Sequence, residues 1–558
     1  MNVRFGAFEV DLEGRRLLKR GMPITLREQS FQVLAALVER PGEIVTREEL
    51  RQRLWSPDTF VDFEVALNSA VSRLRDALGD SANSPGVIET IPKRGYRFLV
   101  PIAKRPAVAV MPFVNQTADA KDDYLGDGLA DELIRVLSRI DGLRVTARSV
   151  AFRFKGQPWD ARQVGRELGV EAVLEGSVWR SADRIRITVN LVGVNDGFNL
   201  WAQRFDGNMG DLFGIQDEVC AAAAAALHVR LAVRIPECRP THVTAYVQYL
   251  KGSHLLKKRR PDDVRRAFEY LQEAIRLDPS FAEPYYGAAM FYNVSAAFGA
   301  LPPRSALPEA EDLLSKGLAL DENSARLHST LGMLRMYQWR WTESEQAHRR
   351  AMSLEPTNAF PHMAYPILCT LLGRHDEALS HAGKAVELDP LDLMTNFRLV
   401  QANYYARRYD EAVRTGRIAI ELTPDSPYTH FYLALSLGAV GLKDEAWSAA
   451  NTGKTLNDGL PLGEGYFGYV AGVMGHTVEA RSVIKELQAR RQRAYSPALP
   501  IAWTYLGLGE TASVLEWLET ALAEREPYLG SLIVFPGYDA IRHHARFRQL
   551  TRELKLST

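Results

Sequence analysis

Residues 240–558 contain a repeat of 34 residues, and this repeat constrains the fold of the chain more than any other feature. Ala-rich segments end in proline at this spacing, and small residues recur at the same spacing at two further positions. The positions concerned are Pro356, Pro390 and Pro424; Ala310, Ser344, Ala378, Ala412, Ala446 and Ala480; and Gly317, Ala351, Ala385, Ala419 and Gly453. Small side chains let helices approach closely, and proline ends a helix. We therefore expect stacked helix pairs, an all-α solenoid.

This pattern resembles the tetratricopeptide repeat, or TPR, which has the same period and the same small residues where helices cross. We expect about eight repeats over residues 240–558, with residues 536–555 as a carboxy-terminal capping helix. TPR arrays normally present a concave groove, so the resemblance implies a protein or peptide partner there. Aromatic residues of the first helices could line that groove, or pack between repeats: Tyr285, Tyr286, Phe291, Tyr292, Tyr404, Tyr405, Phe431 and Tyr432.

Residues 62–98 combine an amphipathic helix with a basic hairpin. The apolar face of the helix carries Leu67, Val71, Leu74 and Leu78, at helical spacing. Two short β segments follow, joined by Pro92-Lys93-Arg94-Gly95. A polar helix face with arginine, followed by such a hairpin, is the plan of a winged helix-turn-helix. The stretch has five basic and five acidic residues, so its charge leaves DNA binding and a purely structural role equally open.

The elements before this stretch complete a recognisable order. Residues 1–25 predict short antiparallel strands, residues 26–39 a helix, and Thr46 with Glu49 a capping box that starts a second helix. The segments LREQSFQVLAALVERPGEIVTREEL, NSAVSRLRDALG and TIPKRGYRF resemble the OmpR/PhoB-type DNA-binding domain of bacterial response regulators. The resemblance covers residues 1–105 and implies binding to double-stranded promoter DNA. A homodimer on tandem half-sites would be consistent with that family.

The resemblance assigns roles on the helix. Arg73 matches the base-reading arginine, whose guanidinium can donate two hydrogen bonds to guanine. Arg75 matches an arginine that contacts phosphate. Asn68, Ser69 and Ser72 match positions that face the major groove. The alternative for both arginines is a solvated helix face.

Two further parts of the domain receive roles from the resemblance. Thr46, at a helix amino terminus, is placed to hold a phosphate with its N–H and hydroxyl groups. In the wing, Pro92-Lys93 stands where many members have Arg-Gly, so the minor-groove role passes to Lys93 or Arg94. Arg97 fits a position internal to its strand, where it would pair locally or reach a phosphate.

Residues 106–235 predict a mixed α/β domain. A buried strand at 108–113 precedes a helix at 124–140, and two or three longer strands follow over 171–207 before a last helix at 212–231. The segments AVMPFVNQT, YLGDGLADEL and GVEAVLEGSVWR resemble the TolB-like amino-terminal domain found in bacterial regulators. That resemblance implies a module for sensing or interaction.

The sequence of this domain gives little support for an enzyme active site. Gly126-Asp127-Gly128 lacks a third glycine and a following Gly-Lys-Ser/Thr, so it is not a phosphate loop. An acidic cluster around it could bind a metal, but acidic residues near a helix start also suit the helix dipole, which we favour. The cluster comprises Asp119, Asp122, Asp123, Asp127 and Asp131. The first histidine of the chain is His228, so a Ser-His or Cys-His pair within this domain is implausible. We expect no enzyme activity, no cofactor and no metal.

Composition sets the remaining expectations. The 68 basic and 68 acidic residues cancel, so any contact with nucleic acid must be local. Cys220, Cys238 and Cys369 are too scattered for a disulfide framework or a metal site, which fits a reducing compartment. No signal peptide or membrane span is visible, so we expect a soluble, cytoplasmic protein.

These features favour a one-component transcription regulator, in which the second and third domains receive a signal or a partner. Because the winged helix begins the chain, we expect no phosphoacceptor domain before it and no aspartyl-phosphate switch. The alternative is an interaction scaffold whose winged helix docks protein instead of DNA.

Overall fold

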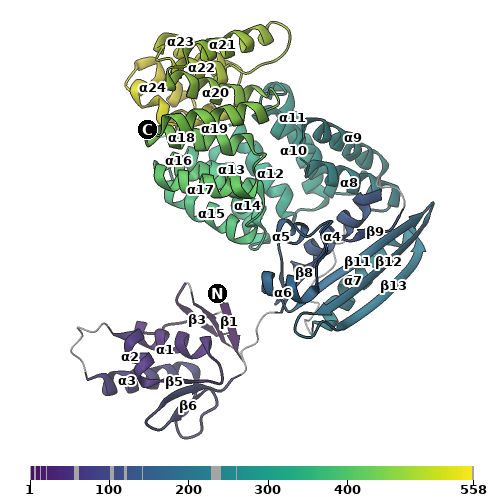
Figure 1. The fold of residues 1–558 in the computed structure, drawn as a ribbon, viewed down its shortest axis with the longest axis vertical. Coiled ribbons are helices and arrows are strands. Elements are labelled where there is room, and N and C mark those ends of the chain that lie inside the picture. Colours follow the sequence, from purple (N-terminus) through teal and green to yellow (C-terminus); the bar gives the residue numbers. More distant parts are fainter. Residues whose placement is uncertain are drawn as a thin grey trace. The chain divides into compact units, whose positions relative to one another are not determined.

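The computed structural model describes residues 2–5, 8–12, 14–19, 22–55, 62–100, 106–117, 122–140, 142–227, 240–258 and 260–555. Asp119, Cys238 and residues 101–105, all part of the expectations above, lie outside these ranges. The chain forms two compact units, Met1–Pro106 and Ala107–Thr558 (Figure 1).

The amino-terminal unit holds a four-stranded antiparallel sheet, three helices and a three-stranded sheet. The first sheet runs in sequence order: β1 (Asn2–Phe5), β2 (Phe8–Asp11), β3 (Arg16–Lys19) and β4 (Met22–Ile24). The second has the order β5-β7-β6, with β5 (Ile44–Thr46), β6 (Ile88–Ile91) and β7 (Gly95–Phe98). The helices are α1 (Glu28–Glu39), α2 (Arg47–Leu54) and α3 (Phe63–Leu78). This is the predicted order of strands, helices and wing.

The core of this unit fixes the position of α3. Its four predicted apolar residues are buried, and the hydroxyl of Ser30 on α1 donates to the carbonyl of Ala70 at 3.0 Å. The helix begins at Asp62, whose carboxylate accepts from the N–H of Val65, and it ends at Gly79 in the left-handed region. At Gly95, where β7 passes β5, an added Cβ would lie 2.1 Å from the carbonyl oxygen of Val45. Only glycine therefore allows this pairing.

The second unit begins with a mixed α/β module. Its sheet has the order β10-β8-β11-β12-β13, and β9 also pairs with β11. The strands are β8 (Ala107–Val110), β9 (Val114–Asn115), β10 (Arg144–Val145), β11 (Ala172–Ser181), β12 (Arg184–Gly193) and β13 (Asn199–Asn208). The helices are α4 (Asp123–Leu137), α5 (Arg148–Phe152), α6 (Ala161–Leu168), the short η2 (Met209–Asp211) and α7 (Leu212–Ala226).

Alternating burial along β12 shows which face of the sheet lies on the core of the module. Ile185, Ile187, Val189 and Leu191 are buried with residues of α4 and α7, as expected for a period of two. This core continues beyond the module, because it includes Tyr249, Leu271 and other residues of the helices that follow. The module and the start of the helical array therefore share one core.

The array consists of helix pairs, as the 34-residue period predicts (Figure 1). The pairs are α8 (Val243–Leu256) with α9 (Pro261–Leu277), α10 (Glu283–Ala297) with α11 (Pro303–Leu320), α12 (Ala325–Tyr337) with α13 (Trp341–Leu354), α14 (Ala359–Leu371) with α15 (His375–Leu388), α16 (Leu393–Tyr405) with α17 (Tyr409–Leu422), α18 (Pro427–Ala439) with α19 (Lys443–Leu456), α20 (Pro461–Met474) with α21 (Thr477–Arg491) and α22 (Leu499–Gly507) with α23 (Thr511–Ala523). The small residues from Ala310 to Ala480 that recur every 34 positions are all 0% exposed. Ser344 illustrates the close approach, since its hydroxyl on α13 donates to the carbonyl of Gly332 on α12, the first helix of its pair, at 2.7 Å.

The carboxy-terminal segment differs from the single capping helix predicted for residues 536–555. Only α24 (Ala545–Glu553) is α-helical, and it packs on α23. Before it lie two 3₁₀ segments, η3 (Pro527–Ile533) and η4 (Pro536–Ile541). A proline at the start of each limits the backbone, and η3 packs against the first helices of three successive pairs, α10, α12 and α14. The segment therefore runs along the inner layer of the array.

Within the residues that the structure describes, we find no helix with the length and apolar character needed to cross a membrane.

Candidate nucleic-acid interface

The outer face of α3 carries the residues predicted to face DNA. Asn68, Ser69 and Ser72 are exposed, and Arg73 is partly exposed. The Arg73 guanidinium folds back along the helix, where it donates to the Ser69 carbonyl at 3.1 Å and to the Ser69 hydroxyl at 2.8 Å. These bonds lie at the surface and compete with water, so their net contribution is small. Arg73 can therefore extend toward a base edge.

Arg75 does not lie where the prediction of a phosphate contact needs it. Its side chain is 10% exposed, and the guanidinium donates to the Ile88 carbonyl at 2.7 Å and to the Thr90 hydroxyl at 2.9 Å. The Asp80 carboxylate lies 3.7 Å away. The alternative of a solvated helix face does not hold either, because the wing strand β6 covers this side of α3. Arg75 thus fastens the wing to α3.

Asp80 completes this attachment. Its carboxylate accepts hydrogen bonds from three successive backbone N–H groups, those of Gly86, Val87 and Ile88, at 2.7, 3.1 and 2.9 Å. Burial alone would raise the pKa of Asp80, but the hydrogen bonds from these N–H groups lower it below its ordinary value. The carboxylate therefore stays ionised and holds the loop before the wing.

Thr46 forms the predicted capping box with Glu49. The Thr46 N–H and hydroxyl groups both donate to the Glu49 carboxylate at 2.7 Å, and the Thr46 oxygen accepts from the Glu49 N–H at 3.2 Å. The bond from the Thr46 N–H is the main reason that the pKa of Glu49 falls to about 2. Both groups predicted to hold a phosphate are thus bonded to Glu49, and a phosphate would have to displace that carboxylate.

The wing presents two basic residues at its turn. Lys93 and Arg94 are exposed, and Lys93 adopts a left-handed backbone with φ of 61°. The Arg94 N–H donates to the Ile91 carbonyl at 3.1 Å and closes the turn. Arg97 on β7 pairs with Glu89 directly opposite on β6 at 3.3 Å, as expected for a residue internal to the hairpin.

Sequence reasoning missed a cluster between α2, α3 and β7. The Arg47 guanidinium donates to Glu64 at 2.5 Å, to Asn68 at 3.2 Å and to the Tyr96 hydroxyl at 3.2 Å. The Tyr96 hydroxyl in turn donates to Asn68 at 2.9 Å. Arg47 directly follows the capping threonine, and Tyr96 lies in the GYRF segment, but no local pattern indicates that both meet Asn68.

In the second unit, the acidic cluster on α4 is balanced by basic partners. Asp127 accepts from Lys155 at 2.6 Å and lies 3.2 Å from His254, and Asp131 pairs with Arg148. Burial would raise the pKa of Asp127, but His254 and Lys155 lower it. Among the described residues, no group of three or more His, Cys, Asp or Glu side chains is placed to hold a metal.

The glycine pair beside Asp127 lies within α4 and not in a loop before it. A Cβ at Gly126 would come within 2.5 Å of the Phe113 carbonyl oxygen, so this glycine serves close packing of the helix against the chain that follows β8. The segment is not a phosphate loop, in agreement with the sequence analysis.

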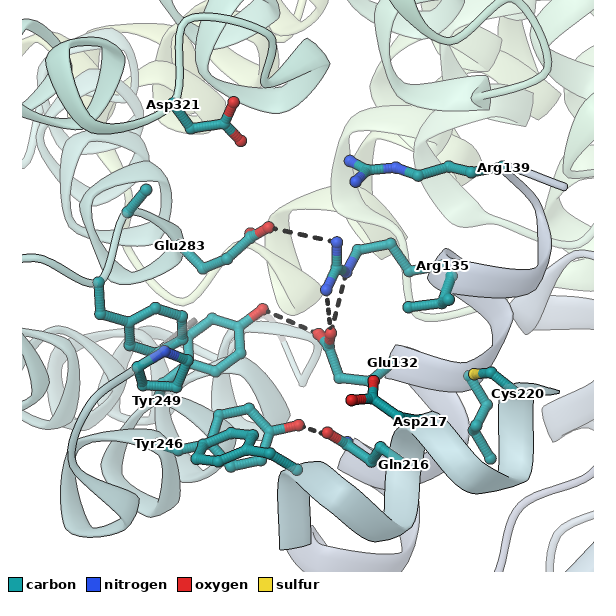
Figure 2. A pocket seen from close by; sticks show the side chains of 16 residues that line it. Glu132, Arg135, Arg139, Gln216, Asp217, Cys220, Tyr246, Tyr249, Glu283 and Asp321 are labelled. Carbon is teal, nitrogen blue, oxygen red and sulfur yellow. Dashed lines mark hydrogen bonds and ion pairs between the residues drawn. The ribbon is translucent and has the colours of Figure 1, made fainter. Parts of the chain in front are cut away.

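A pocket of about 70 Å³ lies where α4 and α7 meet the first two helix pairs of the array (Figure 2). Glu132 lies at its centre, accepting from Arg135 at 2.9 Å and from the Tyr249 hydroxyl at 3.2 Å, and Arg135 also faces Glu283 at 3.6 Å. Burial would raise the pKa of Glu132, but Arg135 lowers it. A space of this size suits a few ordered water molecules. The contacts of Glu132 with Tyr249 and of Arg135 with Glu283 join α4 to α8 and α10 across this pocket.

The predicted groove of the array is filled by the chain itself. Tyr285, Tyr404, Tyr405, Phe431 and Tyr432 are buried, so packing is their role, the alternative named in the sequence analysis. Both Tyr404 and Tyr405 contact the ring of Phe535, which follows η3. A groove open to a peptide along these helices is thus not what the structure shows.

Comparisons with known proteins identify two of the segments. Residues 21–98 match the family described as "Transcriptional regulatory protein, C terminal", and residues 104–222 match the "HilA/YgeH-like transcriptional regulator, second domain". The family found for the middle segment is thus the HilA-like one, and the resemblance to TolB-like domains stays a prediction.

Three curated relatives illustrate the similarity. The Transcriptional regulator HilA of Salmonella typhimurium is 22% identical over 398 residues, which are 67% of this chain and 68% of that protein. The Putative adenylate cyclase 3 of Rhizobium meliloti is 33% identical over 250 residues, 44% of this chain and 42% of that protein. The Phosphate regulon transcriptional regulatory protein PhoB of Rhizobium meliloti is 36% identical over 94 residues, 17% of this chain and 40% of that protein.

The chain thus spans less than half of two of these relatives. It carries an OmpR/PhoB-type winged-helix domain at its amino terminus, followed by a HilA-like regulator domain and helical repeats that resemble a TPR solenoid.

Proposed function

We propose that this protein is a transcription regulator that binds specific promoter DNA through α3 and the wing. The observation that carries the proposal is the two-sided character of α3. One side is buried in the core, while Asn68, Ser69, Ser72 and Arg73 form a polar outer face. A helix of this kind fits the major groove, and Arg73 there can donate to both acceptors of a guanine.

The local charges support specific and not general binding. Of the charged residues in the stretch 62–98, Arg75 pairs with Asp80 and Arg97 with Glu89. Arg73, Lys93 and Arg94 remain for DNA, with Lys93 and Arg94 at the exposed turn of the wing. Few phosphate contacts give weak nonspecific affinity, so base contacts must supply most of the discrimination.

The role of the second unit is to receive a signal or a protein partner. The helical repeats support interaction with protein, and a homodimer on DNA remains part of the proposal. A cytoplasmic location stays a prediction from the sequence. The name of the cyclase relative concerns a protein of which more than half lies outside the aligned region, so we do not carry its activity over.

The test is binding of the full chain to the DNA upstream of its own gene, measured by fluorescence anisotropy at several salt concentrations. Arg73→Ala should lower the affinity for the specific site by about 5- to 150-fold, from about 1–3 kcal/mol for one bidentate base contact. Arg16→Ala, in the exposed part of β3, is the matched control. Full affinity of Arg73→Ala would refute the base-reading role. Absence of binding to any DNA at low salt would favour the alternative, a scaffold whose winged helix docks protein.

A further inference from the structure

The cluster around Asn68 determines which of its amide groups can meet a base. Asn68 is exposed on α3, and its Oδ1 accepts from the Tyr96 hydroxyl at 2.9 Å and from Arg47 at 3.2 Å. Arg47 and Tyr96 also contact each other, at 3.2 Å between Nη2 and the hydroxyl oxygen. Tyr96 is 2% exposed, and its ring lies 5.3 Å from the Arg47 guanidinium carbon. Both groups are thus held in place.

The orientation of the Asn68 amide follows from the chemistry of its partners. A guanidinium can only donate hydrogen bonds, so the amide atom beside Arg47 must be the oxygen. If the amide turned by 180°, its NH₂ group would face a donor and leave the Arg47 bond unmade. The Nδ2 group therefore points away from the cluster, and in the described part of the chain it has no hydrogen-bond partner.

We infer that Arg47 and Tyr96 set the base preference of Asn68 by holding it as a hydrogen-bond donor. An asparagine that reads adenine needs both amide groups, since Oδ1 accepts from N6 and Nδ2 donates to N7. Here Oδ1 already accepts two hydrogen bonds within the protein. Asn68 should therefore favour guanine, which presents two adjacent acceptors in the major groove, over adenine, and should disfavour cytosine, which presents a donor.

This inference rests on the proposed DNA binding, and it gives Arg47 and Tyr96 a positioning role. Neither has to touch DNA. Glu64, 60% exposed, neutralises Arg47 at 2.5 Å, so the arginine can serve the cluster without acting as a general phosphate anchor. A purely structural cluster would affect stability but leave the preferred base unchanged.

The experiment selects bound sequences from a randomised DNA library with the full chain and with variants. Asn68→Ala identifies the operator position that Asn68 contacts, as the one whose preference disappears. At that position the unaltered protein should select guanine. The double variant Arg47→Met with Tyr96→Phe frees Oδ1, so adenine should rise about tenfold relative to guanine. Tyr505→Phe, in α22 of the second unit, is the matched control, and thermal unfolding checks that every variant folds.

The outcomes separate the two proposals. Failure of the unaltered protein to enrich any sequence would refute sequence-specific DNA binding itself. Enriched sequences that select adenine at the Asn68 position, or an unchanged preference in a folded double variant, would overturn the positioning role while leaving DNA binding intact. Enriched sequences in which Asn68→Ala changes no position would show that Asn68 reads no base, which also overturns it.

Discussion

The carboxy-terminal segment gives the sharpest test of how the array works. Residues 527–541 lie inside the layer of first helices, and Leu529, Leu532, Phe535 and Tyr538 are at most 1% exposed. Phe535 packs against five aromatic rings, those of Tyr404, Tyr405, Tyr469, Trp503 and Tyr538, with centroids 5.1 to 6.4 Å away. We predict that this segment is a permanent part of the core and not a strap that a partner displaces.

The free energy of exposing the segment decides whether it is a permanent part of the core or a strap that a partner displaces. Exposing four such side chains would cost about 6–12 kcal/mol, at about 1.5–3 kcal/mol each. A peptide present at a hundredfold excess over its Kd supplies only about 2.7 kcal/mol toward an opening. Displacement from outside is therefore unfavourable by several kcal/mol, unless the competing segment replaces every buried contact.

The first test removes the aromatic ring of Phe535. Phe535→Ala should destabilise the array by about 3–5 kcal/mol, as expected for a fully buried phenylalanine. The control Val478→Ala removes a side chain that is 78% exposed and should change the unfolding midpoint little. Urea unfolding of the full chain, followed by tryptophan fluorescence, measures both.

Amide hydrogen exchange measures whether the segment opens without a partner. The N–H groups of Val534, Phe535 and Tyr538 are bonded within the segment, so their exchange reports its opening. They should exchange as slowly as the amides in the middle of α12 and α14. Faster exchange in the segment than in those helices, or an unchanged midpoint for Phe535→Ala, would refute the reasoning and favour a displaceable strap.

Three further predictions follow from single positions. Gly95→Ala should destabilise the winged helix by about 1–3 kcal/mol in thermal unfolding, because its Cβ would clash with the Val45 carbonyl, whereas Gly86→Ala, with 3.7 Å to its nearest neighbour, should not. Arg75→Met should cost about 1.5–3 kcal/mol in urea unfolding of the amino-terminal unit, because the buried hydrogen bonds to the wing are lost; a stability equal to the unaltered protein would contradict its role. Burial lowers the pKa of His348 to about 3, so the unfolded chain binds a proton below pH 6.5 that the folded array does not. The array should therefore lose roughly 1.4 kcal/mol of stability per pH unit between 6.5 and 3 from this residue alone, and His348→Leu should flatten that part of the profile.

Much of the fold could be predicted because its signals are local and periodic. The small residues from Ala310 to Ala480 are all fully buried, as helix pairs with a fixed crossing point require. The apolar face of α3 and the capping box of Thr46 with Glu49 also follow from spacing alone. These features depend on residues within one or two helices.

The misplaced parts depend on contacts between distant segments. Arg75 lies on the flank of α3 by helical periodicity, and only the fold of residues 80–90 over that flank buries it. The Asn68 cluster likewise joins residues 21 and 28 positions apart. For residues 527–541, proline and glycine signal an irregular backbone, but nothing in the sequence indicates that it returns to α10, α12 and α14.

The acidic residues at the ends of two repeats also have partners that the sequence does not predict. Glu355, just before a recurring proline, accepts from Arg139, which follows α4, and Asp389, one period later, accepts from Ser149 of α5. The sequence reveals the 34-residue spacing of these acids but not that the sheet module binds them. Since the module also shares a core with the first repeat, it is held along several repeats at once. A partner on the array therefore acts on a body whose parts are tightly joined. Displacing any of the first four helix pairs, α8–α9 to α14–α15, must break apolar contacts, ion pairs or hydrogen bonds with the module.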